Sequence, residues 1–146
     1  MQANARENYL ATEVMTAPPQ KLQLLLIEGA MRFCNLALAR WEQGDQEAAG
    51  EALTRAQGVI TELIAGVRPE HNRELARKAT SIYLYLFRTL VDAHMRHDAQ
   101  MVQDAMRVLE IERGTWQEVC RRLAGTTPPP VEMPAEDYTP LGDLSA

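Results

Sequence analysis

Residues 21–41 read KLQLLLIEGAMRFCNLALARW, and the pattern in this stretch decides the fold class. It contains no proline and a single glycine, and its apolar residues recur at steps of three and four, which is the spacing of a helix. They form two stripes. The first stripe holds Leu22, Leu25, Leu26, Gly29, Phe33, Leu36 and Ala37. The second stripe holds Leu24, Ile27, Met31, Cys34, Leu38 and Trp41. Such a helix is buried on most sides, or it keeps one stripe for a partner.

Breaks and capping residues divide the chain into four helical segments, which we expect at about 18–43, 45–65, 70–97 and 98–124. Thr16 and the two prolines after it begin the first segment, because a threonine hydroxyl caps free amides and proline fits a first turn. Gly44 and Asp45 separate the first two segments, and Asp98 caps the last. We expect Gly125 to end it.

The resulting architecture is an all-α, antiparallel up-down four-helix bundle. No segment shows the period-two pattern of a strand, and joints of a few residues force successive helices to run antiparallel. We expect an N-terminal arm over residues 1–15, the bundle over 16–124, and a disordered tail over 125–146 that is rich in proline and acidic residues.

The third segment repeats the two-faced pattern of the first. One of its rows contains Leu75, Ala79, Ile82, Leu86, Leu90 and Ala93, and a second points away: Leu84, Phe87, Val91 and Met95. The fourth segment has a single core stripe of Val102, Ala105, Leu109, Trp116, Val119 and Leu123. The second row of the third segment fits either a groove for a partner or a wide core, because bundle helices touch two neighbours.

Composition excludes several classes of function. The chain has 146 residues, 46% of them hydrophobic, and a formal net charge of -5. Its 15 basic residues are scattered among acidic ones, so we expect no nucleic-acid partner and no anionic membrane surface. No uninterrupted apolar run reaches the roughly 18 residues of a spanning helix, and the polar start lacks a signal peptide's apolar region. We therefore expect a cytoplasmic protein without membrane insertion.

The sequence offers no positive sign of catalysis. It contains no GxSxG, Walker A, GxGxxG or HExxH motif. His94 and His97 lie on adjacent turns beside Asp98, but a metal site needs three or four convergent ligands and no further ligand is evident. Cys34 and Cys120 sit among apolar residues and are expected to be reduced, buried thiols. We expect no catalytic residue, no cofactor and no metal.

Several runs occur together in an order that resembles the flagellar secretion chaperone family, FliS. They are NYLATEVMTAPPQKLQLLLIEGAMRF, ALTRAQGVITEL, SIYLYLFRTLVDAH and TWQEV. The features shared with the family are Tyr9, the helix start from Val14 to Leu22, Glu28-Gly29-Ala30, Arg55-Ala56-Gln57, and the pair Tyr83 and Tyr85. The likeness covers about residues 7–123. Ile27, Leu84 and His94 depart from the residues usual in the family.

The resemblance implies a cytosolic helical bundle that binds the disordered C-terminal segment of flagellin. It implies that the chaperone prevents premature polymerisation and delivers the subunit to the flagellar type III export gate. The N-terminal arm would cover part of the client surface when no client is bound, with Tyr9, Leu10 and Val14 as its docking residues. A disordered terminus is the alternative for this arm.

We expect the client to bind the row Leu84, Phe87, Val91 and Met95. In the stretch 21–41, we expect the first stripe to form bundle core and the second to be shared between a neighbouring helix and the arm. The alternative function is a helical scaffolding protein that oligomerises through the same stripes and has no flagellin client. A weak homodimer is compatible with either function.

Overall fold

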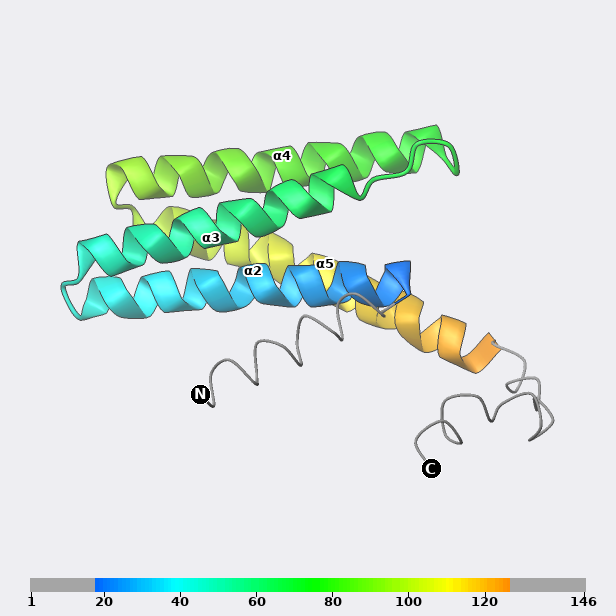
Figure 1. Cartoon of the computed structure of the whole chain (residues 1–146), viewed down its shortest axis with the longest axis horizontal. Coiled ribbons are helices and arrows are strands. Elements are labelled where there is room, and N and C mark those ends of the chain that lie inside the picture. The colour runs from blue at the N-terminus through cyan, green and yellow to red at the C-terminus, as the bar shows by residue number, and fades with distance from the viewer. Residues whose placement is uncertain (1–17, 127–146) are drawn as a thin grey trace, which may run out of the picture.

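The computed structural model describes residues 18–126, which form four antiparallel helices (Figure 1). These are α2 (Pro19–Glu42), α3 (Gln46–Ala65), α4 (Arg73–Arg96) and α5 (Ala99–Thr126). α2 packs against α3 and α5, and α4 packs against the same two helices, so the bundle closes into a ring. The predicted all-α up-down bundle is confirmed, and none of the described residues forms a strand. α5 continues through Gly125, the residue expected to end it.

The joints are built from the residues that the sequence predicted. Gly44 has a φ of 77°, in the left-handed region that glycine adopts without strain. Asp45 caps α3 by accepting a hydrogen bond from the amide of Ala48. Asp98 accepts from two amides in the first turn of α5. These caps fix where α3 and α5 begin.

The starts of α2 and α4 differ from the expected positions. Asn72 caps α4 by accepting from two backbone amides, so this helix begins three residues later than expected. Pro18 occupies the capping position of α2, where no side chain makes a capping hydrogen bond. Thr16, the expected cap, lies outside the described residues.

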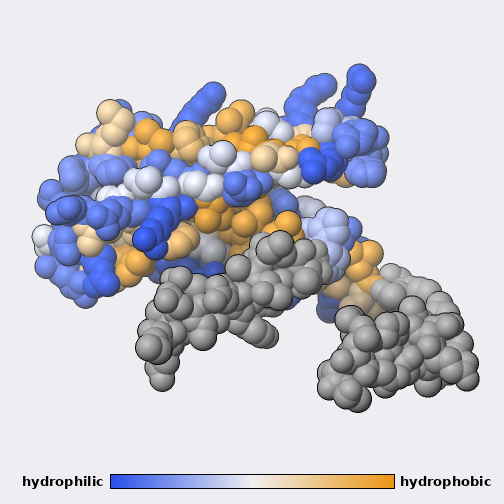
Figure 2. Space-filling view, in the orientation of Figure 1, coloured by the Kyte–Doolittle hydropathy of each residue, from blue (hydrophilic) through white to orange (hydrophobic). Residues whose placement is uncertain are grey.

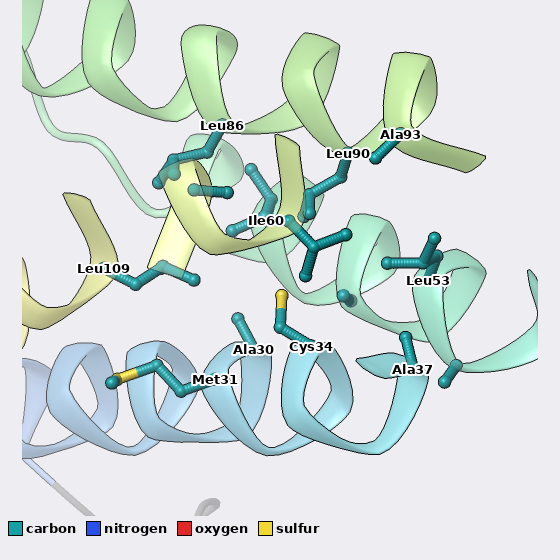
Figure 3. Close-up of a cluster of buried hydrophobic side chains, with 14 of the residues drawn as sticks. Ala30, Met31, Cys34, Ala37, Leu53, Ile60, Leu86, Leu90, Ala93 and Leu109 are labelled. Carbon is teal, nitrogen blue, oxygen red and sulfur yellow. The ribbon is translucent and has the colours of Figure 1, made fainter. Parts of the chain in front are cut away.

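One hydrophobic cluster joins all four helices (Figure 3). Its fully buried members include Ile27, Ala30, Cys34, Ala37, Ala49, Leu53, Ala56, Ile60, Leu63, Leu86, Leu90, Ala93, Val102, Ala105 and Leu109. α2 and α3, which share the most extensive interface, contribute four of these alanines and can therefore approach closely. The larger side chains of α3, α4 and α5 fill the space between the helices.

The expectation for the two stripes of α2 is wrong. The second stripe supplies most of the core, because Leu24, Ile27, Met31 and Cys34 are all buried. From the first stripe only Gly29 and Ala37 are buried, whereas Leu36 is exposed. Helical period defines both stripes equally well. Which one faces inward depends on where α3 and α5 lie around α2, and the period does not contain that information.

α2 is also apolar enough, by length and composition, to cross a membrane. The core helix of a globular protein passes the same test, and so does a signal sequence near the N-terminus of a chain. In this fold Ile27, Ala30 and Cys34 are completely shielded by the other helices. The core therefore accounts for part of the apolar character of α2, since 39% of its most apolar stretch is buried.

The core does not extend to the end of the bundle where α4 begins and α5 ends. Leu75 and Leu123 belong to inward-facing rows by sequence, yet they are 62% and 42% exposed. Figure 1 shows the last turns of α5 leading away from the first turns of α4. The inward-facing residues of α4 and α5 therefore do not pack against each other at this end. The expectation that Leu123 belongs to the core is wrong.

Candidate functional site

The residues predicted to bind a partner form a strip along α4. We call Leu84, Phe87, Val91 and Met95 the α4 strip. Leu84 is 36% exposed and Met95 is 75% exposed, whereas Phe87 and Val91 are half-buried. Phe87 also packs against the core cluster. Figure 2 shows apolar side chains following α4 along this face of the molecule. The strip is thus anchored in the core at its middle and open to solvent at both ends.

The position of the α4 strip follows from helical geometry. Its members are separated by steps of three and four residues, which keeps them on one face. The buried row of the same helix contains Leu86, Leu90 and Ala93 and lies about a third of a turn away. α4 therefore carries a second apolar row in addition to the row that is buried in the core.

Two open hollows lie at opposite ends of the junction between α3 and α4. The loop hollow, of about 490 Å³, is lined by Ile64, Val67, Pro69, Arg73, Ala76, Arg77, Thr80 and Ser81. The histidine hollow, of about 540 Å³, is lined by Gln46, Glu47, Gly50, Glu51, Thr54, Arg55 and His94. Arg73, Arg77 and Thr80 continue into Leu84 at helical spacing, so the loop hollow and the α4 strip share one face of α4.

A polar cluster lies on the buried side of α4, about a quarter of a turn from the strip. Tyr83 is only 1% exposed, and its hydroxyl accepts a hydrogen bond from the side-chain amide of Gln23 on α2. Burial raises the pKa of Tyr83 to about 12, and the negative charge of Glu112 on α5 adds to the rise. Burial also raises the pKa of Glu112, while a hydrogen bond with Trp116 opposes that rise. The cluster joins α2, α4 and α5 through groups that favour their neutral forms.

A second apolar band, which sequence reasoning had assigned to the core, lies on α2. Leu22, Leu25 and Phe33 are half-buried and Leu36 is exposed, and Figure 2 shows apolar side chains over α2 below the polar side chains of α3. We call these four residues the α2 band. The signal for it was present as the first stripe, but its orientation was misjudged. The predicted arm residues Tyr9, Leu10 and Val14 lie outside the described residues.

The histidines at the end of α4 serve the fold. His94 is half-buried against Gly50 of α3, and His97 adopts the left-handed conformation that ends the helix. Within residues 18–126, no three His, Cys, Asp or Glu side chains are arranged to hold a metal ion. Cys34 is fully buried and burial raises its thiol pKa to about 12, whereas Cys120 is half-buried. The raised pKa keeps Cys34 in its unreactive thiol form at neutral pH.

Comparison with known proteins matches the chain to one family. The sequence model of the family described as "Flagellar protein FliS" matches residues 1–123. The flagellar secretion chaperone FliS of Salmonella typhimurium is 36% identical over 107 residues, which are 73% of this chain and 79% of that protein. The protein of the same name from Bacillus subtilis is 32% identical over 110 residues, covering 75% of this chain and 81% of the relative. The Vibrio cholerae protein is 22% identical over 108 residues, 74% of this chain and 79% of its own length.

Proposed function

Because the chain belongs to the FliS family of flagellar secretion chaperones, we propose that it binds the disordered C-terminal segment of flagellin in the cytoplasm. Binding would keep the subunit from polymerising and allow its delivery to a component of the flagellar type III export gate. In this proposal the chain acts by binding and carries out no chemical step.

The observation that carries the proposal is the α4 strip. A disordered segment loses conformational entropy when it orders on a surface, so it needs a large apolar contact to compensate. Leu84 and Met95 expose apolar surface that the bundle does not use, and Phe87 and Val91 supply a floor between them. An amphipathic segment that folds into a helix would match such a row with its own apolar residues at steps of three and four.

The loop hollow supports a contact longer than the strip alone. It extends the same face of α4 beyond Leu84, and Ile64, Val67 and Ala76 give it an apolar lining. A client that follows the junction would therefore meet apolar surface along most of α4. This length suits a segment that wraps along a bundle better than a compact folded partner.

We further propose that the N-terminal arm covers apolar surface when no client is bound, through Tyr9, Leu10 and Val14. The arm leads directly into α2, which carries the α2 band of Leu22, Leu25, Phe33 and Leu36. Exposed apolar patches promote self-association, and a covering arm limits it. Such a cover lowers the apparent affinity for the client by the fraction of covered molecules.

Calorimetric titration of the full-length chain with a peptide of the flagellin C-terminal segment tests the proposal. We expect one-to-one binding with a markedly negative heat-capacity change, the signature of apolar burial. The absence of saturable binding would overturn it. If the chain binds no peptide and sediments as a stable homodimer, the scaffolding function would replace the chaperone function.

A further inference from the structure

The loop hollow combines an apolar lining with a basic rim. Ile64 and Val67 are half-buried and pack against the core, so they form a firm apolar floor at the end of α3. Arg73 and Arg77 are exposed on the rim, and no acidic residue lines the hollow. A surface of this kind selects a segment with apolar anchors next to acidic side chains.

The two rim arginines have charge available for such a segment. Within residues 18–126, neither Arg73 nor Arg77 forms an ion pair, whereas the neighbouring Lys78 pairs with Glu74 at 3.9 Å. Arg68, on the connection before α4, donates to the carbonyls of Ala65 and Val67. In a chain with a net charge of -5, this is a local concentration of positive charge beside apolar surface.

We propose that the C-terminal segment of this chain, residues 127–146, docks in the loop hollow. The segment contains no lysine or arginine, and its four acidic residues are Glu132, Glu136, Asp137 and Asp143. Tyr138 follows directly after the acidic pair at 136–137, and Leu141 lies three positions further along the chain. In the docked state Tyr138 and Leu141 fill the apolar floor while Glu136 and Asp137 face Arg73 and Arg77.

The connectivity allows this contact. In an up-down bundle α5 ends at the same end at which α3 ends and α4 begins, and Figure 1 shows this arrangement. Glu136 lies ten positions after Thr126. A fully extended run of this length spans up to about 33 Å. The prolines at 128–130 and 134 stiffen the connection and reduce the entropy lost on docking.

The charge of the loop hollow favours this segment over the other end of the chain. Residues 1–17 carry Glu7 and Glu13 but also Arg6, so their side chains are less negative than those of residues 127–146. The family model matches residues 1–123, and the docking segment lies beyond that match. The proposal therefore concerns a property of this chain in particular. The loop hollow also lies on the path proposed for the client, so the test below contains no client and its outcome does not depend on flagellin binding.

Nuclear magnetic resonance of the ¹⁵N-labelled full-length chain tests the proposal. In the native chain we expect backbone order parameters above about 0.6 for residues 136–141, the value below which a backbone is flexible. Tyr138→Ser should lower these values below about 0.6 and shift the amide signals of Ile64, Val67 and Ala76. The double variant Arg73→Glu/Arg77→Glu should do the same, and it should fold because both side chains are exposed and surface substitutions change stability little.

Lys78→Glu is the control, because it makes the charge change of one of the two substitutions, one residue from Arg77, but lies outside the hollow. It should leave residues 136–141 ordered. An equal loss of order in this control would overturn the proposal in favour of general electrostatic attraction. Order parameters below about 0.6 in the native chain would also overturn it. The proposal would likewise fail if the amide signals of the hollow responded to Tyr9→Ser instead of Tyr138→Ser, because the arm would then be the occupant. It would also fail if these signals changed with protein concentration, because a second copy of the chain would then be the occupant.

Discussion

Gln23 on α2 donates a hydrogen bond to the buried hydroxyl of Tyr83 on α4, across the diagonal of the bundle. The two helices otherwise meet mainly through their common neighbours α3 and α5. The contact therefore fixes how α4 is rotated, and with it the direction in which the α4 strip faces. This makes Tyr83 a structural determinant of the candidate site even though its own side chain is not accessible.

Replacing Tyr83 by phenylalanine should lower the free energy of unfolding by about 1–2 kcal/mol, because the amide of Gln23 loses its partner in a part-buried environment. Urea unfolding followed by circular dichroism measures this change. Tyr85→Phe is the matched control, since Tyr85 is 46% exposed and should change stability by less than about 0.5 kcal/mol. Equal effects of the two variants would contradict the role assigned to Tyr83.

Glu112→Gln should stabilise the protein at neutral pH. Burial raises the pKa of Glu112 in the folded chain above its unfolded value, so the folded state binds more protons in the interval between the two values. Stability due to this group is therefore full below the unfolded pKa and is lost as pH rises through the folded pKa. Thermal unfolding should show a gain for the glutamine variant at pH 7 that disappears below about pH 4. A gain that persists at low pH would refute this assignment.

Gly50 and Gly58 should respond differently to alanine. Alanine favours a helix over glycine by about 1 kcal/mol, and nothing lies within 4 Å of a Cβ added at Gly58. At Gly50 the added Cβ would lie 2.6 Å from Nε2 of His94, so the imidazole must move. We expect Gly58→Ala to stabilise by about 1 kcal/mol and Gly50→Ala to gain less. Adding His94→Ala should restore the gain at position 50. Chemical unfolding of the three variants measures these changes, and equal gains for Gly50→Ala and Gly58→Ala would contradict the prediction.

Truncation should separate the core row of α4 from its strip. Leu86 is completely buried, so Leu86→Ala should cost about 2–5 kcal/mol of unfolding free energy. Met95 is mostly exposed, and Met95→Ala should change stability by less than about 0.5 kcal/mol. Denaturant midpoints report both. A large loss for Met95→Ala would mean that the strip belongs to the core of the isolated chain.

The sequence predicted the helices and their joints because the signals are local. Gly44, Asp45 and Asp98 act on backbone groups within a few residues, so their roles can be recognised without tertiary information. The α4 strip was also visible, because one row of α4 is apolar beyond the row that its neighbours bury. The order of the helices around the ring follows from short connections in an up-down chain.

The errors concern properties that depend on neighbouring helices. Leu36 and Cys34 lie in equally regular apolar stripes, yet Cys34 is buried and Leu36 is exposed, because α3 and α5 cover only one side of α2. Leu75 and Leu123 are exposed because the first turns of α4 and the last turns of α5 diverge. The cluster of Tyr83, Glu112 and Trp116 joins residues that are up to 33 positions apart, so no local sequence pattern predicts it.

The most direct test of the account compares flagellin-peptide binding by Leu84→Asp and Leu75→Asp. Both variants place the same charge at an exposed leucine of α4, but only Leu84 belongs to the strip. Calorimetry should show affinity at least about tenfold weaker for Leu84→Asp, equal to about 1.4 kcal/mol, with its helical circular dichroism retained. Leu75→Asp should bind as the native chain does. Native affinity in Leu84→Asp, or unfolding of that variant, would contradict the assignment of the α4 strip as the client surface.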